Sequence, residues 1–146
     1  MTKPAHSARE IAADVAAGRT NAVETAKAAL ARIEAAKALN AVVTIDPART
    51  LADAAAVDER LRAGETMRLA GVPIVVKDNI WTRGWRVTQG SRLFADFIAP
   101  RDAIAVERLR EAGAVVAGIG ATSSSPARAS PHRRCSARRG IPSIPR

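Results

Sequence analysis

The sequence predicts an α/β fold with a mixed central sheet, and three observations support this prediction. Segments with a helical spacing of apolar residues alternate with short runs of β-branched residues. Glycine, proline and asparagine mark the turns between these segments. The chain has 146 residues, 47% of them hydrophobic, which is enough for one domain with a buried core. Because helices connect the short strands, we expect at least some of the strands to be parallel.

The first predicted element is a helix that begins at a capping box. Ser7 and Glu10 have the spacing of this motif, so we expect a helix from there to about residue 17, where Gly18 ends it. The segment before the helix, MTKPAH, is polar and lacks the apolar core of a signal peptide.

A second helix follows, and either Thr20 or Asn21 caps it. Its apolar residues recur on one face, and we expect it to end between residues 36 and 39. Residues 41–45, with the sequence AVVTI, are β-branched and few in number. They are therefore interpreted as a strand.

The third predicted helix begins at Asp46 and Pro47, a cap residue followed by a proline at the first helical position. We expect it to reach about Arg62, with Gly64 just beyond its end. The next segment, residues 71–77, is a turn followed by an apolar run that is typical of a buried strand.

Residues 81–100 are predicted to form a loop that carries every aromatic ring of the chain. A fourth helix follows, capped by Asp102 or a neighbour and ended by Gly113. Residues 114–117 are predicted to form a last buried strand. The four aromatic residues are Trp81, Trp85, Phe94 and Phe97.

The positive charge of the chain belongs mostly to its last segment. Of the 23 basic residues, six arginines and no acid lie in residues 119–146, which leaves 17 bases against 14 acids elsewhere. Residues 121–146 also hold four of the eight prolines and six serines, with few apolar residues. We therefore divide the chain into a folded part, residues 1–120, and a basic tail, residues 121–146, which is expected to be disordered.

Several classes of protein are not indicated by the sequence. Cys135 is the only cysteine, so the chain has no internal disulfide and nothing suggests secretion. No apolar run approaches the length that spans a membrane, and a cytoplasmic protein is expected. His6 and His132 have no partner at metal-ligand spacing, so no metal site is predicted.

Lys77 is the residue most relevant to chemistry, because it ends an apolar strand and enters a polar loop. Strand ends are where α/β folds place functional groups. A desolvated amine loses its proton more readily, and a neutral amine can act as a general base towards a hydroxyl. The alternative is a surface lysine whose amine reaches water, and position alone favours this alternative.

Three sequence blocks, in order along the chain, favour the functional interpretation of Lys77 instead. They are LAGVPIVVKDNI at residues 69–80, VTQGS at residues 87–91 and RDAIAVERLREAGAVVAG at residues 101–118. Together they closely resemble the amidase signature family, over roughly residues 7–120. The resemblance implies part of an α/β/α fold with a mixed central sheet, and hydrolysis of a small-molecule amide without a cofactor. It also implies that Lys77 is the base of a Ser–cis-Ser–Lys triad.

In that family the two triad serines lie in a later Gly/Ser-rich block, which this sequence does not contain. Ser123, Ser124 and Ser125 form a serine cluster without flanking glycines and are interpreted as a linker. The chain alone is therefore expected to be inactive. The same resemblance also fits a fragment of the A subunit of a glutamyl-tRNA amidotransferase, which has the same triad.

Other residues of the blocks have alternative interpretations. Asp78 either orients Lys77 or fixes a turn, and the turn is the more common role. Gly90 and Ser91 are interpreted as a turn. Trp81 and Trp85 either line a substrate pocket or belong to the core, and core residues are more common.

The tail has two interpretations. Its arginine, serine and proline content is typical of a GC-rich gene read out of frame, so we hypothesise a frameshift near codons 120–125. Alternatively, the chain is a non-enzymatic binding protein whose tail binds anionic polymers through charge. Without aromatic residues to stack on bases, such binding would not be specific for a nucleic acid. The folded part, lacking most of its parent domain, is expected to be marginally stable or prone to aggregation.

Overall fold

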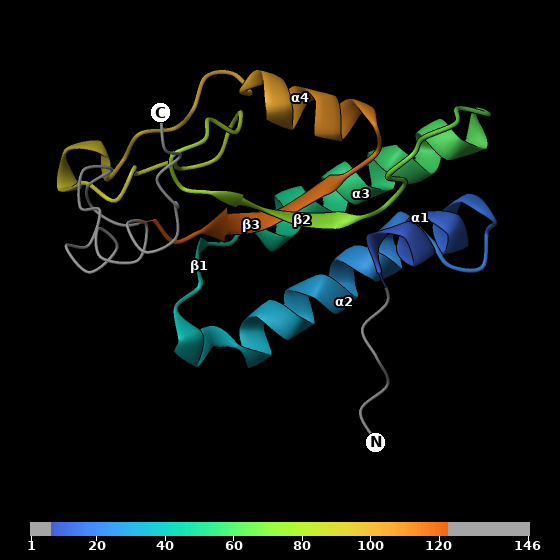
Figure 1. Cartoon of the computed structure of the whole chain (residues 1–146), viewed down its shortest axis with the longest axis horizontal. Helices are drawn as coiled ribbons and strands as arrows, with labels where there is room; N and C mark the ends of the chain where they lie inside the picture. Colours follow the sequence, from blue (N-terminus) through green and yellow to red (C-terminus); the bar gives the residue numbers. More distant parts are fainter. Residues whose placement is uncertain (1–6, 123–146) are drawn as a thin grey trace, which may run out of the picture.

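The computed structural model describes residues 7–122, which form an α/β/α sandwich (Figure 1). A three-stranded sheet lies in the middle, with α4 on one side and α1, α2 and α3 on the other. The predicted α/β class and the mixed sheet are confirmed. The basic tail and the serine cluster at residues 123–125 lie outside the described residues.

The sheet has the order β1-β3-β2, so the last strand in sequence lies in the centre. Strand β2 (Pro73–Lys77) pairs with β3 (Val115–Gly120) in parallel, and β1 (Val42–Thr44) pairs with β3 in the antiparallel direction. All six residues of β3 are buried, because both edges of the strand are paired and both faces are covered. This double pairing explains why β3 continues to Gly120, past the predicted end at residue 117.

Local capping explains where the three helices of the first layer begin. Ser7 and Glu10 form the predicted capping box at the start of α1 (Ala8–Ala16). Asn21 caps α2 (Ala22–Ala35), and a short 3-10 helix, η1 (Lys37–Leu39), follows it. The Asp46 side chain accepts from the backbone N–H of Arg49 at the start of α3 (Pro47–Arg62). The predicted starts of these helices are therefore confirmed.

The first layer packs through small residues. Ala22 and Ala26 of α2 and Ala54 of α3 are fully buried, and they form one hydrophobic cluster with Val15 and Val115. The hydroxyl of Thr50 on α3 donates to the carbonyl of Val116 at 3.0 Å, which joins this layer to the central strand. Small side chains let the helices approach closely, as the alanine-rich composition suggests.

The second layer is formed by α4 (Ile104–Glu111) and the segment before it. Val106 of α4 packs against Val76, Val116 and Ile119 of the sheet, and the buried Trp85 joins the same cluster. The predicted loop also contains a second 3-10 helix, η2 (Arg92–Phe94), and an isolated bridge between Arg86 and Ile98.

Helix α4 begins without a side-chain cap, unlike the three helices of the first layer. Ala103 is the N-cap residue, and no side chain accepts a hydrogen bond there. Of the predicted caps, Asp102 or a neighbour, the structure has the neighbour Ala103, and Asp102 accepts instead from the backbone N–H of Arg83 at 2.6 Å. A long-range contact therefore takes the carboxylate away from the end of the helix.

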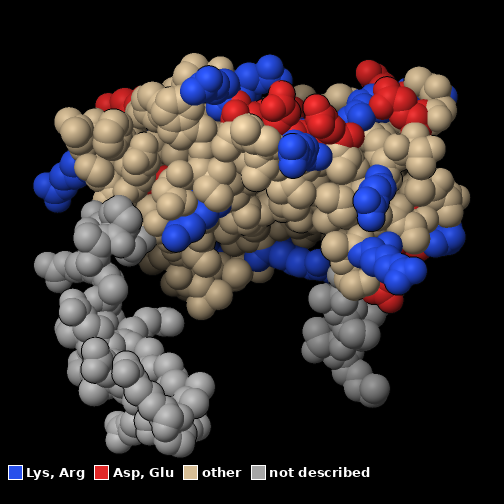
Figure 2. Space-filling view, turned by 45° about the horizontal axis from the view of Figure 1, so that its top comes forward, with Lys and Arg blue, Asp and Glu red and all other residues tan. Residues whose placement is uncertain are grey.

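The described part of the chain is almost balanced in charge, with 16 basic and 14 acidic residues in residues 7–122. Figure 2 shows acidic and basic side chains close together on the face in view, with uncharged surface between the groups. No broad surface of one sign is visible on this face. The charge balance of the described residues therefore gives no separate indication of a nucleic-acid surface.

Candidate functional site

Lys77 is the last residue of β2, and its Cα lies opposite that of Gly120 at the end of β3. It is therefore at the carboxyl edge of the two parallel strands, where α/β folds bind ligands. Its side chain is exposed, and within residues 7–122 no hydrogen bond or ion pair is formed by its amine. The described residues therefore leave the amine open, and they do not surround it with apolar groups.

Asp78, the next residue, is 2% exposed and points away from Lys77. One carboxylate oxygen accepts from the backbone N–H of Thr88 at 2.6 Å, and the other accepts from the Thr88 hydroxyl and, at 3.3 Å, from the N–H of Gly90. Of the two interpretations of Asp78, fixing a turn is therefore the one that the geometry supports. The carboxylate holds a loop beside the end of β2.

The turn that Asp78 holds has a left-handed backbone at two consecutive positions. Gln89 has φ 53° and Gly90 has φ 67°, and such angles are uncommon for a residue with a side chain. The N–H of Gln89 donates to the carbonyl of Asp78 at 2.9 Å, so both the main chain and the side chain of Asp78 bind the turn. The predicted turn at Gly90 and Ser91 is therefore present.

A cavity of about 320 Å³ opens at this end of the sheet. It combines hydroxyl groups with two arginines, and the buried carboxylate of Asp78 lies in its wall. The hydroxyl oxygen of Thr44 in β1 is buried and has no hydrogen-bond partner within the described residues. The lining residues are Val43, Thr44, Asp78, Arg86, Thr88, Gly90, Ser91, Arg92, Ala95, Ala121 and Thr122.

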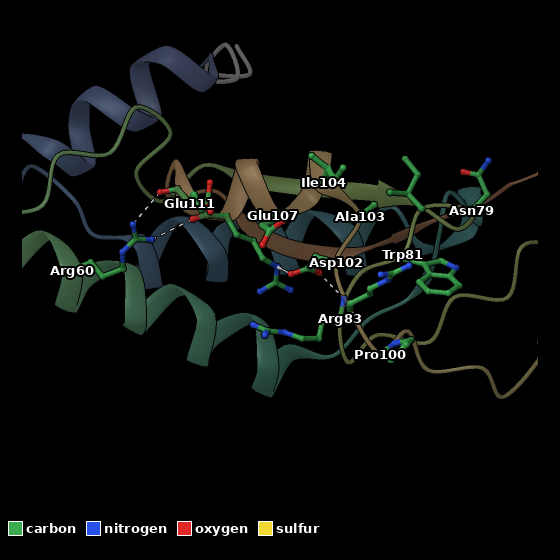
Figure 3. Close-up of a pocket in the computed structure, with 13 residues that line it drawn as sticks. Arg60, Asn79, Trp81, Arg83, Pro100, Asp102, Ala103, Ile104, Glu107 and Glu111 are labelled. Atoms are coloured by element: carbon green, nitrogen blue, oxygen red, sulfur yellow. Dashed lines mark hydrogen bonds and ion pairs between the residues drawn. The ribbon is translucent and has the colours of Figure 1, made fainter.

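A larger cavity, of about 1100 Å³, lies between α4, α3 and the loop after β2 (Figure 3). At one end the guanidinium of Arg101 lies 5.6 Å from the ring centroid of Trp81. Further along, Arg110 pairs with Asp53 at 2.9 Å and with Asp102 at 3.5 Å. The wall of this cavity therefore carries both positively and negatively charged side chains.

The two tryptophans therefore have different roles. Trp85 is 2% exposed and belongs to the core under α4, as the more common interpretation predicts. Trp81 is partly exposed, lines the larger cavity and packs on Phe97 with ring centroids 5.5 Å apart. Lys77 lines neither of the two cavities, although Asn79 and Ile80, just after it, line the larger one.

Within residues 7–122 there is no group of three or more histidine, cysteine, aspartate or glutamate side chains placed to hold a metal ion. In the same part of the chain, no helix is both long enough and apolar enough to cross a membrane.

Comparison with known proteins decides the family. The family described as Amidase matches residues 24–130, which is more than half of the chain. This chain belongs to the amidase family. The match includes Lys77 and the whole sheet, so the resemblance seen in the three sequence blocks is confirmed.

Curated relatives are similar to the chain over most of its length. The A subunit of the glutamyl-tRNA(Gln) amidotransferase of Ralstonia nicotianae is 48% identical over 114 residues, which are 78% of this chain and 23% of that protein. The protein of the same name from Deinococcus radiodurans is 46% identical over 112 residues, 77% of this chain and 23% of that protein. The chain thus spans about a quarter of the length of these relatives.

Solved structures confirm the fold. The peptide amidase of Stenotrophomonas maltophilia superimposes with a TM-score of 0.74 and 34% identity, over 80% of this chain and 25% of that chain. A bacterial aryl acylamidase of the amidase signature family gives a TM-score of 0.74 and 27% identity, over 81% of this chain and 25% of that chain. The described residues therefore correspond to one part of the amidase fold.

Sequence reasoning missed Thr88, whose N–H and hydroxyl donate two of the hydrogen bonds that the buried carboxylate of Asp78 accepts. The two residues are ten positions apart in an irregular segment, and no helical or strand period relates them. The only local signal is the turn sequence that follows Thr88, which marks the loop without identifying its anchor.

Proposed function

We propose that this chain provides the lysine-bearing part of an amidase that hydrolyses carboxamide C–N bonds, with Lys77 as the general base. The observation that carries this proposal is the position of Lys77 at the carboxyl edge of β2, exposed and free of partners within residues 7–122. An amine used as a base must be open to the hydroxyl that it deprotonates. Membership of the amidase family supports the choice of reaction.

The chemistry follows the Ser–cis-Ser–Lys arrangement that the family resemblance implies. Lys77 takes a proton from a bridging serine, which takes one from the nucleophilic serine. The nucleophile attacks the carbonyl carbon, the C–N bond breaks, and the leaving amine receives the proton. Water then cleaves the acyl-enzyme and releases the acid.

Residues 1–146 contain neither of the two serines in a Gly/Ser-rich block. A base without its nucleophile has nothing to activate, so the chain alone is proposed to be inactive. The small-molecule amide is accordingly proposed as the substrate of a complete amidase domain that contains these residues.

Asp78 supports the base through the backbone. It holds the turn at residues 88–90 against the end of β2, and its own N–H donates to the carbonyl of Gly120 at 2.9 Å. These bonds fix the main chain on the C-terminal side of Lys77. The amine therefore projects from a rigid strand end, as catalysis requires of a positioned base.

A second candidate is the A subunit of a glutamyl-tRNA amidotransferase. It is favoured by the identities of 46% and 48% to relatives with that name, against 34% and 27% to the two amidases of known structure. Lys77 would have the same role in either enzyme, and the amide would then be a glutamine side chain.

A chimera tests the proposal. Residues 7–122 replace the aligned segment of the Stenotrophomonas peptide amidase, and ammonia release from a carboxamide is measured. We expect the chimera with Lys77→Met to lose about 10²–10⁴-fold in turnover, as for loss of a general base. The control, Lys37→Met, removes an exposed lysine whose amine pairs only with Glu34 among residues 7–122, and it should keep full turnover. Equal turnover of the two variants would contradict the role of Lys77. Preference for glutamine over simple amides would favour the second candidate.

A further inference from the structure

The smaller cavity, of about 320 Å³, is bounded by three segments that are far apart in sequence. They are the end of β1, the loop at residues 86–95, and the two residues that follow β3. Figure 1 shows β1 and this loop at the same end of the sheet as the end of β3. The volume is at the small end of the range for ligand sites. Asp78 lines this cavity and Lys77 does not, so the cavity is separate from the proposed base.

Two cations in the wall of this cavity have no acidic partner. Arg86 and Arg92 are exposed residues, and within residues 7–122 neither side chain forms a hydrogen bond or an ion pair. A guanidinium group has five N–H donors and no acceptor, and its planar shape matches the oxygens of a carboxylate or a phosphate. Both arginines are therefore available to a ligand that carries negative charge.

The one acid of the wall does not compete strongly for these arginines. Asp78 is the only acidic residue among the described residues that line the cavity, and its carboxylate already accepts three hydrogen bonds. The donors are the N–H and the hydroxyl of Thr88 and the N–H of Gly90. The wall thus carries two positive charges and one negative charge that is bonded elsewhere, which favours an anion.

Two hydroxyl groups of the wall also have a hydrogen to donate. The hydroxyl oxygen of Thr44 is buried and has no hydrogen-bond partner within the described residues. A buried hydroxyl without a partner costs free energy, and a bound acceptor removes this cost. The Ser91 hydroxyl accepts from the N–H of Leu93 at 3.3 Å and donates to none of the described groups. The unused side-chain groups of the cavity can therefore all act as donors.

We infer that this cavity binds a small oxyanion, a phosphate or a carboxylate group, through Arg86, Arg92 and the hydroxyl of Thr44. Bonds from a guanidinium to either group are charge-assisted and stronger than neutral hydrogen bonds. The anion joins β1 to the loop that Asp78 anchors, and it stabilises this end of the sheet by mass action. The site requires neither Lys77 nor the hydrolysis of an amide.

Equilibrium dialysis of the full 146-residue chain against inorganic phosphate, and separately against acetate, tests the inference. Sodium chloride keeps the ionic strength constant, because salt screens the general attraction of an anion to a basic chain. We expect saturable binding of one anion per chain. Binding of phosphate alone identifies an organic phosphate as the class of ligand, and binding of acetate alone identifies an organic acid. Absence of saturable binding of both anions would overturn the inference.

Three arginine variants show whether the anion is bound in this cavity. Arg86→Gln and Arg92→Gln should each weaken binding at least about tenfold, a loss that corresponds to about 1.4 kcal/mol. Arg68→Gln is the matched control and should bind the anion unchanged. Arg68 is exposed, forms no side-chain hydrogen bond or ion pair within residues 7–122, and precedes β2 at the opposite end of the strand from Asp78. Equal weakening in all three variants would show that binding follows overall charge, and the inference would be wrong.

Thr44→Val tests the buried hydroxyl. Valine is similar in shape, and the hydroxyl has no partner within the described residues, so without the anion the variant should melt at the same or a higher temperature. Binding of the anion should weaken about fivefold, because one donor is lost. A variant that binds the anion as tightly as the original chain would place the anion outside the cavity and contradict the inference.

Lys77→Met separates this site from the proposed catalysis. The variant should bind the anion as tightly as the original chain, because Lys77 does not line the cavity. Unchanged anion binding by Arg86→Gln and Arg92→Gln would remove the anion site and leave the role of Lys77 as it stands. Full turnover of the Lys77→Met chimera would remove the proposed base and leave the anion site intact.

Discussion

The carboxylate of Asp78 binds both the backbone N–H and the hydroxyl of Thr88, and this pair joins the end of β2 to a loop ten residues further along. The carboxylate is 2% exposed, so the hydrogen bonds replace its lost hydration. The same carboxylate accepts from Gly90. The pair therefore fixes the surroundings of the strand end from which Lys77 projects.

Replacing Asp78 with alanine should lower the free energy of unfolding by about 3 kcal/mol, because the N–H and the hydroxyl of Thr88 lose their acceptor in a half-buried place. The N–H of Gly90 keeps one acceptor, the Thr88 hydroxyl at 3.2 Å. Urea unfolding followed by circular dichroism measures the change. Asp96→Ala is the control, since Asp96 is exposed in the same loop and forms no hydrogen bond or ion pair within the described residues. Similar stabilities for the two variants would contradict the anchoring role of Asp78.

Gly71 should be far less tolerant of alanine than Gly18. Both have left-handed backbones, with φ 66° and 69°, but a Cβ at Gly71 would lie 2.9 Å from Cα of Ala22, whereas none of the described atoms lies within 4 Å at Gly18. Gly18→Ala should cost about 1 kcal/mol from backbone strain alone. Gly71→Ala should cost about 2 kcal/mol more, because α2 must move. Thermal melts of both variants measure the difference, and equal shifts would show that the contact with α2 is absent.

The chain expressed by itself should be marginally stable and should self-associate. Val43 on β1 and Val75 on β2 are 45% and 50% exposed, so both edge strands of the described sheet present apolar side chains. Light scattering during a thermal melt should show aggregation that increases with concentration. A sharp, reversible melt of a monomer would contradict this expectation.

The gene itself tests the frameshift hypothesis for residues 121–146, which lie almost wholly outside the described residues. We expect that one inserted or deleted base near codons 120–125 brings a Gly/Ser-rich block into frame. Resequencing from codon 110 to well beyond the stop codon provides the measurement. If no frame contains such a block, the tail is a genuine sequence, and the hypothesis is wrong.

Much of the fold was predictable because its determinants are local. Ser7 with Glu10, and Asp46 with Pro47, mark helix starts through contacts within one turn, and the structure has both. The strand ending at Lys77 was equally clear from its apolar run. In each case the sequence spacing and the physical contact are the same feature.

The remaining contacts depend on residues far apart in sequence. Asp58 on α3 accepts from the N–H groups of Ala22 and Val23 at the start of α2, a contact that joins two separate helices. Asp102 binds Arg83 and so does not cap α4. The order of the strands, with β3 in the centre, is also fixed by packing of distant segments. No periodicity in a single sequence encodes such pairs.

The most direct test of the central claim is the turnover of the chimera that carries Lys77→Arg. Arginine keeps the positive charge and much of the length of lysine, but it does not release its proton in proteins and cannot act as a base. If Lys77 is the base, the Lys77→Arg chimera should fold with an unchanged melting temperature and lose about 10²–10⁴-fold in amide hydrolysis, like Lys77→Met. If Lys77→Arg retains full turnover, Lys77 contributes only charge or packing, and the proposed role as base is wrong.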